Sequence, residues 1–139
     1  MNNKLKKELE SFNEVENFRE TYKSLPSHSV VYIFLLEKEV NRLQGSSPIL
    51  KIGETTNFKS RMARYFNVKD IQQIKDKPKR QTAYRLRKFI DSKDTKDIKL
   101  LYKITSKTSK KDLQNEEKRL LKLYLNEHLE TPPLNMGMR

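Results

Sequence analysis

The chain has 139 residues, which suits one folded domain, and we expect a single domain over residues 1–139. Hydrophobic and charged residues each make up 35% of it, and the formal net charge is +12, so its charge favours a polyanionic partner. It has no cysteine and two histidines, which excludes disulfides and thiolate zinc sites and makes a multi-histidine metal site hard to build. Any metal would have oxygen ligands, and Mg²⁺ or Mn²⁺ fits that best.

The first residues are polar and mixed in charge, and no apolar run is long enough to span a bilayer. We therefore expect a soluble, cytoplasmic protein without a membrane partner.

Apolar residues recur every three to four positions over residues 2–24, at Leu5, Leu9, Phe12, Val15, Phe18 and Tyr22. This spacing predicts one amphipathic N-terminal helix that ends at Leu25-Pro26. Its five basic and five acidic residues cancel, which is typical of scaffold. The helix would pack on the core of its own chain, residues 25–139, or be swapped onto a second copy.

Three β-branched or aromatic runs predict strands. Val30–Leu36 and Ile49–Ile52 would form a hairpin, and Ile98–Ile104 would be a third strand. Helices are expected from the Thr55-Thr56-Asn57 cluster to about Phe66, after Pro78, and from near Ser109 to Thr131-Pro132-Pro133. The fold class predicted is α+β, a small three-stranded, mainly antiparallel sheet flanked by helices.

Residues 58–88 carry eleven Lys/Arg against two Asp/Glu, a net +9 of the total +12. We expect this stretch to contact phosphates, in a way that weakens as salt rises. Nonspecific charge attraction explains the stretch equally well. The predicted nucleic-acid contacts are Lys59, Arg64, Lys79, Arg80, Arg85, Arg87 and Lys88.

Five short motifs follow one another along the chain. After Leu25-Pro26 they are Val30-Val31-Tyr32, Lys51-Ile52-Gly53, Arg61, Glu117 and Asn135. In this order and on these elements, the set resembles the motifs of the GIY-YIG nuclease superfamily over nearly all of residues 25–135. Val30 replaces the first Gly of the pattern, and Lys51 replaces the second family Tyr, as in some restriction enzymes of the superfamily.

The resemblance implies a GIY-YIG-like core and a metal-dependent endonuclease acting on double-stranded DNA. Tyr32 would lie near the attacking water, Arg61 would bind the scissile phosphate, and Glu117 would hold one Mg²⁺ or Mn²⁺. The products would carry a 5′-phosphate and a 3′-hydroxyl. Since 139 residues leave no separate DNA-binding module, a restriction-type enzyme is expected, and a homodimer would cut both strands.

Three further residues complete the predicted site. Lys51, next to Tyr32 across the hairpin, would lower the pKa of that phenol or contact phosphate. Tyr65 follows Arg61 by one helical turn and would contact the water or a phosphate. Asn135 matches the family's terminal Asn, which more often braces the site than reacts.

Glu117 is also distinguished by its place on the apolar side of its helix, where an unpaired carboxylate would be costly. Glu116 is the neighbouring alternative. His128 is expected to be a surface or capping residue rather than a ligand.

Other interpretations of these residues stay open. Tyr32 in an apolar strand is by default a core aromatic, and Arg61 is one of many cations on a basic helix. The main alternative function is a catalytically inactive, basic nucleic-acid-binding protein of the same fold, in which Lys51 and Val30 mark a lost site. A basic protein that binds RNA or ribosomes would explain the charge but not the Tyr, Arg and Glu set.

Overall fold

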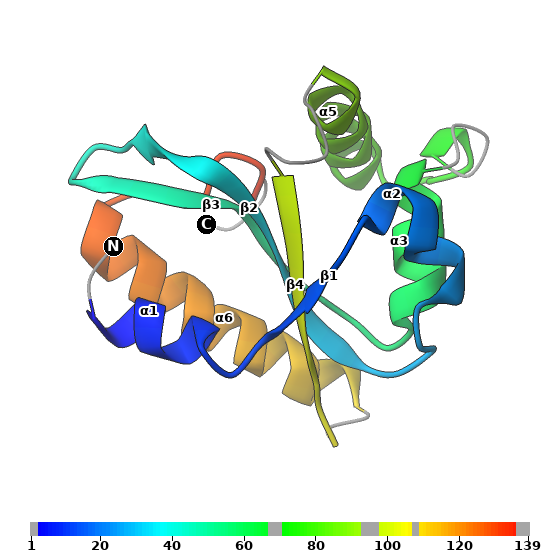
Figure 1. The fold of residues 1–139 in the computed structure, drawn as a ribbon, viewed down its shortest axis with the longest axis horizontal. Coiled ribbons are helices and arrows are strands. Elements are labelled where there is room, and N and C mark those ends of the chain that lie inside the picture. Colours follow the sequence, from blue (N-terminus) through cyan, green and yellow to red (C-terminus); the bar gives the residue numbers. More distant parts are fainter. Residues whose placement is uncertain (1–2, 67–70, 93–97, 107–108, 136–139) are drawn as a thin grey trace.

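The computed structural model describes residues 3–66, 71–92, 98–106 and 109–135. A four-stranded antiparallel sheet forms its centre, with helices on both faces (Figure 1). The strands are β1 (Asn13–Val15), β2 (Val30–Asn41), β3 (Ser46–Thr55) and β4 (Ile98–Ile104), in the spatial order β1-β4-β2-β3. The predicted α+β class is confirmed, whereas the prediction of three strands is one too few.

Alternation along β2 builds two hydrophobic cores, one on each face of the sheet. Val30, Tyr32 and Phe34 face one core, and Val31 and Ile33 face the other. The first core is covered by α2 (Phe18–Thr21), α3 (Phe58–Phe66) and α5 (Lys77–Ser92), and the second by α1 (Asn3–Leu9) and α6 (Lys110–His128). Because both faces are covered, the first five residues of β2, Val30 to Phe34, are buried on both sides of the sheet.

The prediction of one continuous helix over residues 2–24 is wrong. The chain forms α1, crosses to β1, and continues through α2 and a 3₁₀ turn, Tyr22–Ser24. Leu5 is buried in the core under α6, whereas Phe18 is buried in the core on the opposite face of the sheet. A single helix cannot bury residues in the cores on both faces of the sheet. The chain instead crosses from one face to the other as β1, which pairs with the edge of β4.

The other predicted helices begin close to where their capping residues lie. The side chain of Asn57 accepts a hydrogen bond from the backbone N–H of Ser60 at 3.0 Å, and Ser109 accepts from Asp112 at 3.1 Å. Pro78 lies in the first turn of α5. None of the helices in the described part of the chain is long and apolar enough to cross a membrane.

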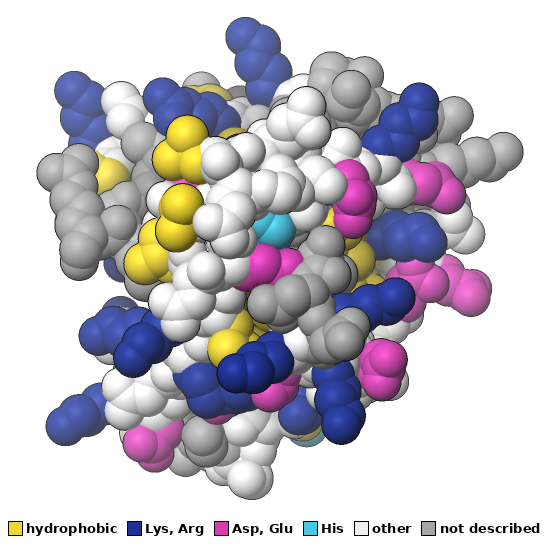
Figure 2. All heavy atoms as spheres, turned by 90° about the vertical axis from the view of Figure 1, so that its left-hand side faces the viewer, with side chains coloured by type: hydrophobic (Ala, Val, Ile, Leu, Met, Phe, Trp, Pro, Cys, Tyr) yellow, Lys and Arg dark blue, Asp and Glu magenta, His cyan; other side chains and the backbone are white. Residues whose placement is uncertain are grey.

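His128, expected at the surface or as a cap, is in fact buried at the C-terminal end of α6. Its Nδ1 lies 2.8 Å from the backbone oxygen of Gln44, and its ring packs on Tyr124 with centroids 4.5 Å apart. The residue therefore fastens α6 to the β2–β3 turn. On this side of the molecule, basic and acidic side chains are intermixed (Figure 2), so the positive excess is not gathered there.

The packing of α1 makes the N-terminal segment part of the fold. Leu5 is fully buried, so Leu5→Ala should lower the free energy of unfolding by about 2–5 kcal/mol, through lost burial and the cavity left behind. Urea denaturation measures this. Leu43 is 77% exposed, and Leu43→Ala, the control, should change stability by less than about 0.5 kcal/mol. Equal effects of the two substitutions would contradict the packing of α1.

Candidate active site

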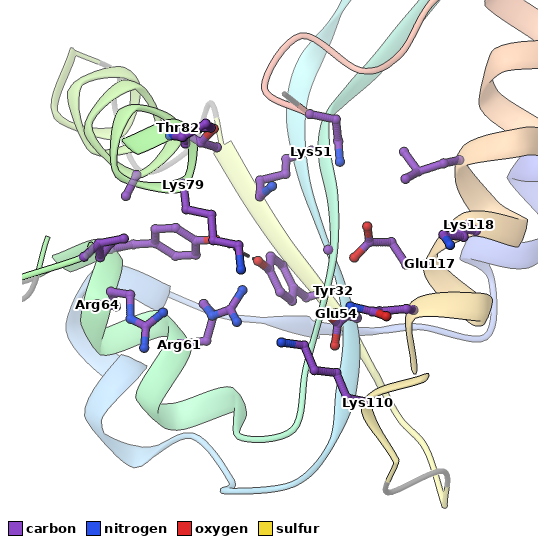
Figure 3. A pocket seen from close by; sticks show the side chains of 18 residues that line it. Tyr32, Lys51, Glu54, Arg61, Arg64, Lys79, Thr82, Lys110, Glu117 and Lys118 are labelled. Carbon is purple, nitrogen blue, oxygen red and sulfur yellow. Dashed lines mark hydrogen bonds between the residues drawn. The ribbon is translucent and has the colours of Figure 1, made fainter. Parts of the chain in front are cut away.

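The six residues predicted as catalytic line one pocket at β3, the edge strand of the sheet (Figure 3). The pocket has a volume of about 440 Å³. Helices α3 and α5 reach it from one face of the sheet, and α6 reaches it from the other. The predicted residues in its lining are Tyr32, Lys51, Arg61, Tyr65, Glu117 and Asn135.

Two tyrosines hold the centre of the site together. The hydroxyls of Tyr32 on β2 and Tyr65 on α3 lie 2.7 Å apart in a buried hydrogen bond. Gly53 lies opposite Tyr32 in the hairpin, and a Cβ at Gly53 would overlap the ring and the hydroxyl of Tyr32. The glycine of the Lys51-Ile52-Gly53 motif is therefore required because the tyrosine ring crosses directly over its backbone.

The two phenols differ in their electrostatic surroundings. Burial and the neighbouring Tyr65 raise the pKa of Tyr32 well above its ordinary value. Burial also acts to raise the pKa of Tyr65, but other influences outweigh it, and that pKa is lowered. They are the charges of Lys51 and Arg61 and the hydrogen bonds with Tyr32 and Arg61. Tyr65 is thus the phenol of the pair that better carries a negative charge.

The expected effect of Lys51 on Tyr32 is therefore wrong. Lys51 pairs with Phe34 across the hairpin, while Gly53 takes the position opposite Tyr32. Its ammonium acts on Tyr65, across the pocket, and is the largest influence that lowers the pKa of that residue.

Arg61 lies beside both phenols. Burial acts to lower the pKa of its guanidinium, but the interactions with Tyr32 and Tyr65 outweigh burial and raise it further above its ordinary value. Arg61 is therefore a fixed positive charge that faces the pocket rather than one of the freely solvated cations of its helix.

Glu117 enters the pocket from α6. Burial raises the pKa of its carboxyl to about 7, the charge of Lys51 opposes this shift, and the charge of Glu54 adds to it. The backbone N–H of Glu54 also interacts with the carboxylate. Glu116, the alternative, instead turns away and pairs with Arg119 at 2.6 Å. Of the two neighbouring carboxylates, Glu117 is the one in the site.

Glu117 is the pocket residue that could hold a divalent cation. Among the described residues, no three His, Asp or Glu side chains gather as a metal site. Mg²⁺ does not require such a cage, because it is usually bound through one or two carboxylates, waters and substrate phosphates. Glu117 fits such an ion, since a cation would offset the burial of its charge and the repulsion from Glu54.

Asn135 braces the edge of the sheet. Its Oδ1 accepts a hydrogen bond from the backbone N–H of Ile52 at 2.8 Å, and its Nδ2 donates to the backbone oxygen of Ile52 at 2.7 Å. The amide thus pairs with β3 as another strand would, between Lys51 and Gly53. Asn135 is a positioning residue, because both ends of its amide are bonded to the backbone.

The predicted nucleic-acid contacts are divided by the fold. Arg64 and Lys79 line the pocket. Lys59, Arg85 and Lys88 are exposed elsewhere on α3 and α5. Of these five residues, Arg64 and Lys79 are therefore the two that share the pocket with Arg61.

Two of the predicted contacts have partners within the protein. Arg80 donates to the backbone oxygen of Ile74 at 3.0 Å, and Arg87 donates to Asp91 at 3.0 Å. Arg80 connects α5 to the segment before it, and Arg87 is bonded within α5. Both arginines are therefore less available to phosphate than their charge alone indicates.

Sequence reasoning missed several pocket residues, above all on α6. Lys110, Gln114 and Lys118 are spaced four residues apart, a helical spacing that places them on the same face as Glu117. That spacing was visible in the sequence, but a count of charge along the chain does not detect it. Glu54, which also lines the pocket, was missed as well.

Comparison of the chain with known protein families, with curated proteins and with solved structures found no match. The resemblance to the GIY-YIG superfamily therefore depends on the ordered motifs and on the pocket in which their residues meet.

The raised pKa of Glu117 predicts a pH-dependent stability. Between about pH 4.5 and 7 the folded protein holds a proton on Glu117 that the unfolded chain has lost, so this residue lowers stability as pH rises through that window. In EDTA, Glu117→Gln should gain about 1–3 kcal/mol relative to the parent between pH 5 and pH 8, since one pKa unit is about 1.4 kcal/mol.

Urea denaturation at the two pH values measures this gain, with Glu116→Gln as the control outside the pocket. A pH dependence in Glu117→Gln equal to that of the parent would show that Glu117 has an ordinary pKa.

Proposed function

We propose that this protein is a metal-dependent DNA endonuclease that hydrolyses phosphodiester bonds with a site of the GIY-YIG type. One observation carries the proposal: Tyr32, Lys51, Arg61, Tyr65 and Glu117, singled out on four separate elements, line a single pocket. A phenol pair, a fixed guanidinium and a buried carboxylate are the groups that phosphodiester hydrolysis needs, for the water, the phosphate and the leaving oxygen.

Arg61 would bind the scissile phosphate. Its guanidinium offers donors in a fixed fork that matches phosphate oxygens, and the two phenols hold it in place. Because it is partly removed from water, its charge acts on the developing negative charge more strongly than a surface arginine would.

The tyrosine pair would accept the proton of the attacking water. The lowered pKa of Tyr65 makes it the phenol of the pair that more readily loses its own proton, and its phenolate, which Tyr32 would stabilise by a hydrogen bond, would then accept a proton from water. The charge of Lys51 would stabilise this phenolate before the water is deprotonated, and Tyr65 would become a neutral phenol as the hydroxide forms. This assignment moves the base from Tyr32, where the family pattern puts it, to Tyr65.

Glu117 would hold one Mg²⁺ or Mn²⁺ with help from water and phosphate oxygens, and such an ion supplies charge neutralisation at the leaving oxygen. Glu54 lies close enough to affect the charge of Glu117 and would strengthen the attraction for a cation. The exposed cations Lys59, Arg85 and Lys88 would contribute affinity for double-stranded DNA without reading its sequence.

A plasmid assay tests the proposed function. Purified protein should nick or cut supercoiled plasmid in Mg²⁺ or Mn²⁺ but not in EDTA, and discrete fragments would identify a restriction-type enzyme. Glu117→Ala should reduce cutting by about 10²-fold or more, the usual cost of removing a group that stabilises transition-state charge.

Glu116→Ala is the matched control, since Glu116 lies next to Glu117 but pairs with Arg119 away from the pocket, and it should cut like the parent. Intact plasmid under all conditions, together with salt-sensitive binding, would contradict catalysis and favour the inactive nucleic-acid-binding protein.

A further inference from the structure

Cations line the pocket on two opposite sides. Arg61, Arg64 and Lys79 reach it from α3 and α5, whereas Lys110 and Lys118 reach it from α6, as Figure 3 shows. These two groups of helices cover different faces of the sheet, and residues of both line the pocket at β3. The α6 side lies outside the basic stretch of residues 58–88, so charge along the sequence does not indicate it.

Lys110 and Lys118 differ from the other basic residues of α6. Arg119, next to Lys118, pairs with Glu8 on α1 at 2.8 Å and with Glu116 at 2.6 Å, so it fastens the two helices together. Lys110 and Lys118, by contrast, are exposed to solvent and line the pocket. Helix α6 therefore separates structural cations on one face from pocket-facing cations on another.

We propose that Lys110 and Lys118 form a second phosphate-binding wall, so that one nucleic-acid strand lies in the pocket between two rows of cations. The inference rests on the proposed function for its ligand, because it takes the substrate to be nucleic acid. The inference adds the path of the nucleic-acid strand through the pocket. Phosphates on one side of the scissile phosphate would contact Arg64 and Lys79, and phosphates on its other side would contact the lysines of α6.

The spacing on α6 suits more than one phosphate. Lys110 and Lys118 are eight residues apart, a rise of about 12 Å along the helix, so each would contact its own phosphate. Gln114, midway between them on the same face, offers amide donors to the same strand. The wall therefore recognises a polymer, whereas a small diester with one phosphate would occupy only the part of the pocket near Arg61.

The salt dependence of DNA binding tests the wall directly. Binding of a short duplex should be measured at several salt concentrations for the parent, for Lys110→Gln/Lys118→Gln, and for Lys111→Gln/Lys122→Gln. The control lysines are exposed on α6 but do not line the pocket. The slope of log K against log[salt] should fall by about 1.8 in the first variant, since each phosphate contact contributes about 0.9, and should stay at the parent value in the control.

An unchanged slope in Lys110→Gln/Lys118→Gln, or an equal fall in the control, would overturn the proposal. Cleavage is tested separately. If the parent does not cut plasmid but Lys110→Gln/Lys118→Gln reduces the slope, the proposed nuclease activity is refuted and the second phosphate-binding wall is supported. If the parent cuts DNA, the KM for DNA should rise in Lys110→Gln/Lys118→Gln and stay at the parent value in Lys111→Gln/Lys122→Gln. An unchanged KM in the first variant, or an equal rise in the control, would also overturn the proposal.

Discussion

The hydrogen bond between Tyr32 and Tyr65 is the contact on which the site depends. Both rings are buried, so each hydroxyl needs a partner within the protein, because a buried hydroxyl left unsatisfied costs about 1–3 kcal/mol. The bond forms because Gly53, opposite Tyr32, leaves room for the ring. Since Tyr65 follows Arg61 by one turn of α3, the contact that packs the helix on the sheet also holds Arg61 beside both phenol oxygens.

The sequence predicts those parts of the fold that bury a regular pattern. β4 matches its predicted range, Ile98–Ile104, because its alternation coincides with its pairing. β2 continues past its apolar run to Asn41, because its polar end still pairs with β3 although nothing is buried there. β1 has three residues, none of them fully buried, and exists because β4 offers an edge. A strand made by tertiary pairing leaves little signal in its own sequence.

The site was predictable where a residue type and its place along the chain were both informative, as for Arg61 and Glu117. The electrostatic role of Lys51 was not, because it depends on strand register: Lys51 pairs with Phe34 and Gly53 pairs with Tyr32, and the ammonium acts on Tyr65. Lys110 and Lys118 were not predicted as pocket residues, for a different reason. Charge was counted along the chain, whereas a helix displays it by face, and only the packing of α6 reveals which face meets the pocket.

A crystal structure of Glu117→Gln bound to a short DNA duplex in Mg²⁺ would test the central claim most directly. Gln keeps the shape of the side chain but removes its charge, so binding should persist while cutting is suppressed. The account predicts a phosphate in the pocket within hydrogen-bonding distance of the Arg61 guanidinium, with Tyr65 on the side from which water would attack. DNA bound only along the exposed face of α5, with no phosphate in the pocket, would contradict it.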